Sequence, residues 1–178
     1  MSFEYCEITK SAQNQKNWKI FGFFYVLIPV FCILEIYSRK NGADVILWML
    51  AIIWSVDIFA YFGGKNFGGP KLAPTISPNK TISGLLCGTL AAAVIGFLSS
   101  FMFSVNSAIF FITVSTILAI IEQGGDLLES KIKRTFDVKD SGSIVPGHGG
   151  ILDRLDGVIL VAPAMLLIIT IFSDKFFL

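Results

Sequence analysis

The chain alternates between long apolar runs and shorter polar segments. Five apolar runs cover residues 18–37, 44–62, 82–103, 107–121 and 157–172, and each is close to the ~20 residues that a membrane-spanning helix needs. No water reaches the bilayer interior, so such segments must satisfy their backbone groups internally as helices. The pattern predicts an all-α fold, a polytopic transmembrane helical bundle of about five spans. The last two runs are the shortest, and bilayer thinning, snorkelling of flanking residues or continuation of the helices into the polar segments would each accommodate their length.

Composition supports a membrane protein. Hydrophobic residues make up 54% of the chain, charged residues 15%, and the mean hydropathy is +0.72. The formal net charge of +1 argues against a nucleic-acid-binding surface, which would be strongly basic. The sequence shows no internal repeat and no low-complexity tract, so we expect one membrane-embedded domain over residues 1–178.

The polar segments differ in charge. With five spans, the amino terminus and residues 63–81 and 122–156 fall on one side of the membrane, and that side holds eleven of the 14 Lys and Arg residues. Positive charge marks the cytoplasmic side of membrane proteins. The two long polar segments are therefore predicted to be cytoplasmic loops, where they can meet nucleotides.

The segment 122–156 concentrates groups that could carry chemistry. If a helix continues through its first part, Asp126, Glu129, Ser130 and Lys133 are spaced to lie on one helix face. The fourth span ends and the fifth begins at the same membrane surface, so Asp126 can approach Asp153. Two carboxylates flanked by basic residues suit a site where Mg²⁺ bridges protein oxygens and substrate phosphates. Capping of the fifth helix is the alternative role for Asp153.

Other polar groups are weaker candidates. Asp57 is a carboxylate near the end of the second span, where an ionisable group usually faces a polar cavity. Glycines between residues 142 and 150 leave backbone amides free to contact phosphates. His148 lies among them without a second His or Cys at ligand spacing, which favours a hydrogen-bonding role over direct metal ligation.

A spaced polar pattern covers residues 130–156. It reads Ser130-Lys131-Ile132-Lys133-Arg134, then Lys139-Asp140-Ser141-Gly142, then Pro146-Gly147-His148-Gly149-Gly150-Ile151-Leu152-Asp153-Arg154-Leu155-Asp156. So many fixed positions make the pattern specific. It resembles the signature of the phosphatidate cytidylyltransferase family, and upstream positions that include Asp57, Lys65 and Lys80 also resemble that family.

The resemblance implies a nucleotidyltransferase that transfers CMP from CTP to phosphatidate, giving CDP-diacylglycerol and pyrophosphate in phospholipid biosynthesis. It implies Mg²⁺ as cofactor, with a second cation possible. The implied partners are CTP, phosphatidate and the lipid bilayer, and the protein would be able to form a homodimer. It also implies a multi-pass protein of the bacterial inner membrane with its site on the cytoplasmic face. By matching positions, the catalytic residues are Asp126, Asp153, Lys133, Arg134, Lys139 and Asp140, of which the first two bind metal. The substrate-binding residues are Ser130, Asp57, Lys80, His148, Gly149, Gly150 and Arg154.

Two other functions remain open at this point. A CTP-dependent polyprenol or phytol kinase would also use CTP at a membrane surface, but it would leave a monophosphate on the lipid and release CDP. A non-enzymatic transporter or structural membrane protein would be expected to place its polar groups near mid-bilayer. The polar residues here cluster in the loops instead.

Overall fold

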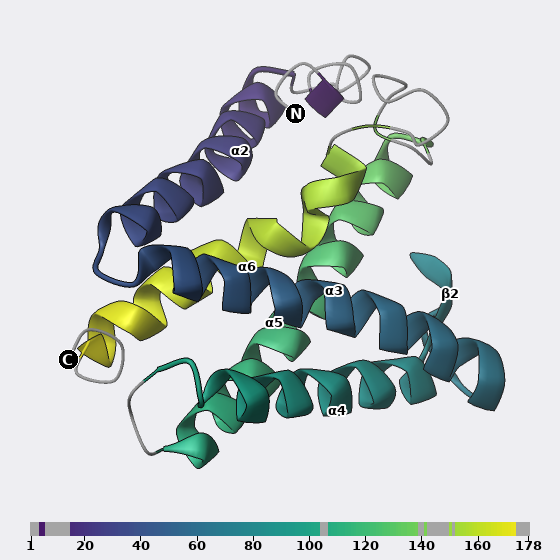
Figure 1. Ribbon diagram of the computed structural model, residues 1–178. Helices are drawn as coiled ribbons and strands as arrows, with labels where there is room; N and C mark the ends of the chain where they lie inside the picture. The colour runs from purple at the N-terminus through teal and green to yellow at the C-terminus, as the bar shows by residue number, and fades with distance from the viewer. Residues whose placement is uncertain are drawn as a thin grey trace.

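A computed structural model of the chain describes residues 4–5, 15–103, 107–138, 141, 150 and 152–173, and of Gln15, Leu152 and Arg154 it describes the backbone alone. The helices are α2 (Gln15–Ser38), α3 (Gly42–Phe67), α4 (Ile82–Ser99), α5 (Ala108–Thr135) and α6 (Leu152–Ile171), and a hairpin of β1 (Lys71–Ala73) and β2 (Ser77–Thr81) joins α3 to α4. Figure 1 shows them as one helical bundle.

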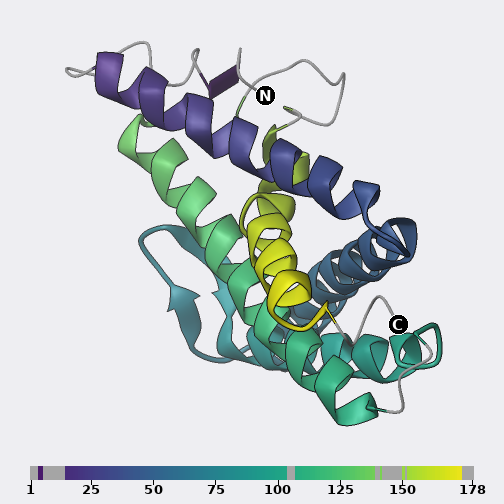
Figure 2. The same cartoon turned by 90° about the vertical axis from the view of Figure 1, so that its left-hand side faces the viewer.

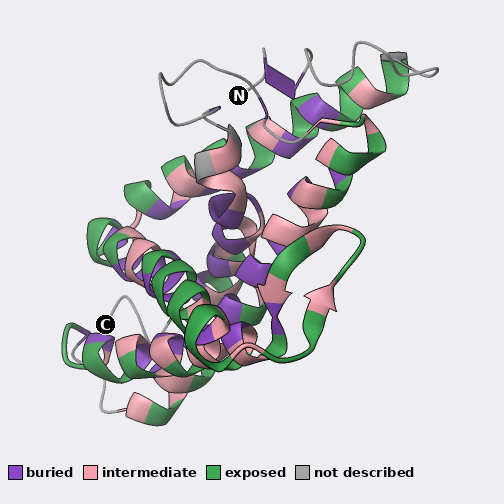
Figure 3. Ribbon diagram, turned by 90° about the vertical axis from the view of Figure 1, so that its right-hand side faces the viewer, coloured by how far each residue is buried: buried purple, intermediate pink, exposed green. Residues whose placement is uncertain are grey.

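The bundle confirms the prediction of an all-α membrane protein. Helices α2, α3, α4 and α5 are long and apolar enough to cross a membrane, and α6 contributes a shorter apolar stretch, Leu155–Ile171. Their outer faces expose large apolar side chains: Phe31 is 63% exposed, Leu90 68% and Ile109 80%. In Figure 3 the exposed residues, coloured green, follow the outer sides of the helices. Such side chains are expected to face lipid.

Two elements extend beyond the apolar runs. Helix α3 continues to Phe67 and α5 to Thr135, whereas the runs end at residues 62 and 121. For α5, continuation past the fourth run was one of three alternatives for a short span, and the helix includes the polar residues that follow Ile121. The hairpin of β1 and β2 was not predicted, because its short polar strands show no alternating apolar pattern.

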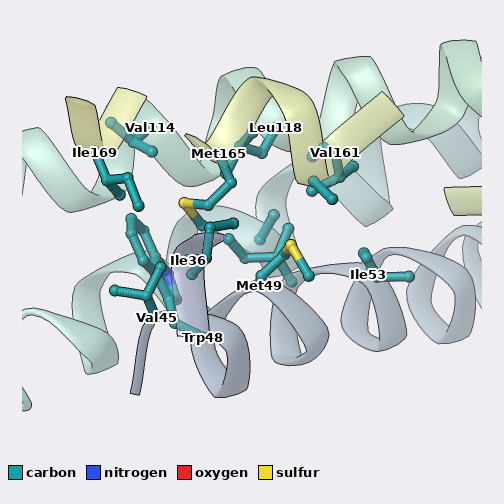
Figure 4. Close-up of a cluster of buried hydrophobic side chains, with 14 of the residues drawn as sticks. Ile36, Val45, Trp48, Met49, Ile53, Val114, Leu118, Val161, Met165 and Ile169 are labelled. Carbon is teal, nitrogen blue, oxygen red and sulfur yellow. The ribbon is translucent and has the colours of Figure 1, made fainter. Parts of the chain in front are cut away.

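The core lies where α2, α3, α5 and α6 meet, as Figure 4 shows. Ile36, Trp48, Leu118 and Met165, one from each of these helices, are at most 1% exposed. The indole Nε1 of Trp48 donates a hydrogen bond of 3.1 Å to Ser115 Oγ, which satisfies a polar group that would otherwise be buried without a partner.

Two glycines form the turn that leads from α3 into the hairpin. Gly68 and Gly69 have φ values of +61° and +98°, a left-handed conformation that glycine adopts without strain. Ser83 Oγ donates to the carbonyl of Gly68. Thr81 Oγ1 accepts a 3.1 Å hydrogen bond from the amide of Gly84, so Thr81 caps the start of α4.

Close helix packing depends on small residues of α4. A Cβ added at Gly88 would lie 3.1 Å from the carbonyl oxygen of Val56 on α3, and one at Gly96 would lie 2.5 Å from that of Phe111 on α5. These glycines therefore allow close packing of α4 against α3 and α5, because a larger residue would push the helix backbones apart.

We expect Gly96→Ala to destabilise the folded protein by about 1–3 kcal/mol, the usual cost of overpacking. The nearest atoms are the backbone carbonyl of Phe111, which cannot rotate away, and Ser115 Oγ at 2.6 Å, which accepts the hydrogen bond of Trp48. Unfolding in mixed micelles, followed by circular dichroism, measures the effect. Gly124→Ala is the matched control, since its added Cβ meets nothing within 4 Å and alanine favours a helix over glycine. Equal stability of the two variants would contradict the packing role.

Candidate active site

A polar cavity opens at the end of the bundle where α3, the hairpin, α4 and α5 meet. Its volume is about 370 Å³, and its polar lining includes Asp57, Lys65, Asn79, Lys80, Gln123 and Asp126. Figure 2 shows the hairpin beside α5. The hairpin segment and the described part of the segment 122–156 therefore lie together, as the topology predicted.

Lys80 is the central cation of this cavity. Its ammonium forms an ion pair with Asp126 and donates a 3.2 Å hydrogen bond to Gln123 Oε1. Gln123 Nε2 in turn donates to Glu122 Oε2 at 3.0 Å. On the next turn of α5, Ser130 Oγ donates to Asp126 Oδ1 at 3.3 Å. The hairpin thus places one lysine against a row of oxygen acceptors on α5.

A second charged group forms between α5 and the start of α6. Lys133 Nζ lies 2.9 Å from Asp153 Oδ1 and 3.1 Å from Glu129 Oε1. The backbone amide of Ser141 donates to both carboxylate oxygens of Asp153, at 3.1 and 3.0 Å, and the amide of Gly150 donates at 3.0 Å. One carboxylate therefore holds the end of α5 and parts of the intervening segment together.

These contacts control the charge of Asp153. Burial by itself would raise the pKa of this carboxyl, but the Lys133 ammonium and the amides of Ser141 and Gly150 outweigh burial and hold the pKa at about 2. Hydrogen bonds to the ionised form have this effect because they favour the charged state. Asp153 is therefore an anion throughout the neutral pH range.

Helix α5 links the two groups. Asp126, Glu129, Ser130 and Lys133 lie on successive turns, and each makes a polar contact described above, so the predicted face is confirmed. Asp126 and Asp153 are brought to the same end of the bundle, but each is paired with a different lysine. The two carboxylates are connected through two turns of α5 and are not joined by a direct contact.

The remaining predicted site residues differ in position. Asp57 lines the polar cavity. Arg134 donates 3.4 Å hydrogen bonds to the carbonyls of Ile76 and Val138, so its contacts tie the hairpin to the end of α5. Gly150 contributes its amide to Asp153. Lys139, Asp140, His148 and Gly149 lie outside the described residues, as does the side chain of Arg154.

The structure adds residues that were not among the predicted site residues. Glu122 and Glu129 are each 1% exposed, and Gln123 is 5% exposed, yet all three contact the charged groups above. An ionisable residue at the edge of an apolar run is a functional signal, and the spacing of Glu122, Asp126 and Glu129 at three and four residues could have identified them. The Ser141 amide could not have been found, because backbone contacts leave no trace in side-chain type.

The oxygen ligands present fit Mg²⁺. Within the described parts of the chain, no cluster of three or more His, Cys, Asp or Glu residues converges as a complete metal cage. Mg²⁺ commonly uses one or two carboxylates and completes its shell with water and substrate phosphates. The side chains of Asp126 and Asp153 are only partly buried, and each pairs with a lysine ammonium, so a divalent cation would share each carboxylate with its present partners.

Comparison with known proteins gives a consistent result. A model of the cytidylyltransferase family matches residues 4–172, a range that includes α2 to α6. The phosphatidate cytidylyltransferase of Rickettsia typhi is 42% identical over 170 residues, covering 92% of this chain and 73% of the relative. That of Rickettsia felis is 43% identical over 156 residues, covering 84% and 69%. That of Brucella abortus is 39% identical over 163 residues, covering 91% and 60%.

Proposed function

This chain belongs to the cytidylyltransferase family, and on that premise we propose that it transfers CMP from CTP to phosphatidate, giving CDP-diacylglycerol and pyrophosphate. The relatives named above carry the name phosphatidate cytidylyltransferase. The apolar helices make the chain a membrane protein, which suits a lipid acceptor.

The observation that carries the proposal is the pairing of charges at one end of the bundle. Lys80 with Asp126 and Lys133 with Asp153 place two ammonium groups and two carboxylates along α5, beside a cavity of about 370 Å³. Ammonium groups bind phosphate oxygens, and carboxylates can share a divalent cation with phosphates. CTP and phosphatidate together bring four phosphates that need such neutralisation.

The proposed reaction is a displacement at phosphorus. A phosphate oxygen of phosphatidate forms a new bond to the α-phosphorus of CTP, and the bond from that phosphorus to the oxygen bridging to the β-phosphate breaks. Pyrophosphate leaves with the bonding electrons. Such reactions depend on positioning and on stabilisation of charge, so no side chain needs to act as a nucleophile.

Individual residues have distinct parts in this proposal. Lys80 and Lys133 orient the phosphates and balance their charge, and Ser130 supports the orientation of Asp126. Asp126 and Asp153 are the residues that would hold Mg²⁺. When bound, the ion would supply charge neutralisation at the reacting phosphates. Asp57 and Gln123 line the cavity where the nucleotide would lie.

The membrane placement completes the proposal. The positive charge of the loops supports an active site on the cytoplasmic face of a bacterial inner membrane. An active site on that face can bind CTP from the cytoplasm. The homodimer implied by the family resemblance stays a prediction, and analytical ultracentrifugation in detergent would measure the assembly. A second cation and the extent of the domain are likewise predictions.

The decisive experiment distinguishes the lipid products. Purified protein in detergent is incubated with phosphatidate and Mg²⁺, with CTP labelled either in the cytidine or at the γ-phosphate. We expect the cytidine label to enter the lipid and the γ-label to appear in pyrophosphate. Parallel reactions with polyprenol or phytol test the kinase alternative, for which only the γ-label would enter lipid. If neither label reaches any lipid although the protein is folded, both enzyme assignments are rejected.

A further inference from the structure

A second cavity lies between the start of α2 and the end of α5. Its volume is about 350 Å³. It is lined by Trp18 and Phe21 from α2 and by Leu128, Lys131, Ile132 and Thr135 from α5. The Trp18 ring also packs edge-on against Phe136, with ring centroids 4.9 Å apart, so the two helix ends meet beside the cavity.

This cavity is separate from the candidate active site. At 100° per residue, Leu128, Lys131 and Thr135 point to the side of α5 opposite to Asp126 and Lys133. The cavities also share no lining residue. A ligand of the second cavity therefore does not need to be a ligand of the first.

The lining of this second cavity suits a ligand with one apolar part and one charged part. Trp18, Phe21, Leu128 and Ile132 form an apolar wall, while the exposed Lys131 provides a cation. Lys16 and Lys19 are exposed on the same turn as Trp18 and add positive charge nearby. The candidate membrane span of α2 begins at Lys16, and Trp18 packs against Phe136 beyond the end of α5, so the cavity lies at the membrane-surface end of α2. At this depth lipid headgroups lie beside tryptophan and lysine side chains.

We propose that this second cavity binds one phospholipid with an anionic headgroup, with an acyl chain against Trp18 and Leu128 and the headgroup phosphate against Lys131. A soluble phosphate would leave the apolar wall uncovered, and a neutral lipid would leave the lysines without a counter-charge. An anionic phospholipid satisfies both parts of the lining. The inference rests on this cavity and does not depend on the proposed reaction.

The test uses the fluorescence of Trp18. Bromine on an acyl chain quenches a tryptophan that it contacts, so the full chain is placed in vesicles containing dibrominated phosphatidylglycerol or dibrominated phosphatidylcholine. The Trp54→Phe background removes an indole that is 59% exposed, while Trp48 is buried. Trp18→Phe in the same background identifies the signal that belongs to Trp18. Phosphatidylglycerol is used because it is anionic without being the proposed substrate.

We expect phosphatidylglycerol to be preferred over phosphatidylcholine by about fivefold, as one lysine near a membrane surface provides. Lys131→Gln is expected to abolish most of this preference. Lys71→Gln, in β1 and outside the cavity, is expected to retain it, and thermal unfolding checks that both variants are folded. Equal quenching by the two lipids, or an unchanged preference in Lys131→Gln, would overturn the proposal. Absence of Trp18 quenching by either lipid would show that the cavity is closed to lipid and would also overturn it.

Discussion

Asp153→Asn is expected to lower the rate of CMP transfer to phosphatidate by about 10³-fold or more. The substitution removes a carboxylate that Lys133 and the amides of Ser141 and Gly150 hold in its ionised form. Losing one organised electrostatic group typically lowers kcat by ~10²–10³-fold, and here a proposed metal ligand is lost as well. The measurement is kcat/KM with cytidine-labelled CTP at saturating phosphatidate.

The same assay applies to Asp126→Asn, for which we expect a loss of similar size. Asp44→Asn is the matched control, because Asp44 also lies in the first turn of a helix, α3, and is exposed away from the site. Its activity is expected to equal that of the unmodified protein. A tenth or more of normal activity in Asp153→Asn, with normal stability, would remove Asp153 from the catalytic residues.

Lys133→Met is expected to destabilise the protein by about 3–5 kcal/mol, in addition to its effect on activity. Glu129 is 1% exposed and its ion-pair partner is Lys133, at 3.1 Å. Removal of the lysine leaves the buried Glu129 without its ion-pair partner and Asp153 without its counter-charge, and breaking a buried pair in this way has a cost of up to that order. The free energy of unfolding in mixed micelles measures the effect.

A double substitution separates the loss of stability caused by the Glu129 charge from the loss caused by the changed shape of the Lys133 side chain. Glu129→Gln added to Lys133→Met is expected to restore part of the lost stability, because Glu129 then carries no charge, while Asp153 keeps the hydrogen bonds from the amides of Ser141 and Gly150. Glu35 and Arg39 form the matched control pair, also four residues apart, with a separation of 3.2 Å and greater exposure. Arg39→Met is expected to change stability by ~1 kcal/mol or less. A Lys133→Met effect no larger than that of Arg39→Met would contradict the buried-pair interpretation.

The amino-acid sequence alone determined the membrane bundle and the end of it that carries the polar groups. Apolar runs of near-membrane length specify helices because the bilayer offers no other partner for the backbone. The order of the runs then places residues 63–81 and 122–156 on one side. The spacing along the chain also predicted the shared face of Asp126, Ser130 and Lys133, because helix periodicity is a local property.

Only the tertiary structure decided which charges meet. Lys80 lies on the hairpin and its partner Asp126 lies on α5. Lys133 lies on α5 and its partner Asp153 lies on α6. Neither pair can form before the chain is folded. The hairpin that carries Lys80 depends on left-handed turns at Gly68 and Gly69 and on hydrogen bonds across the loop. Its short polar strands lack the alternating apolar pattern from which a strand could be predicted. Local spacing could therefore predict the candidate carboxylates, whereas their separate lysine partners follow from contacts between residues distant in the chain.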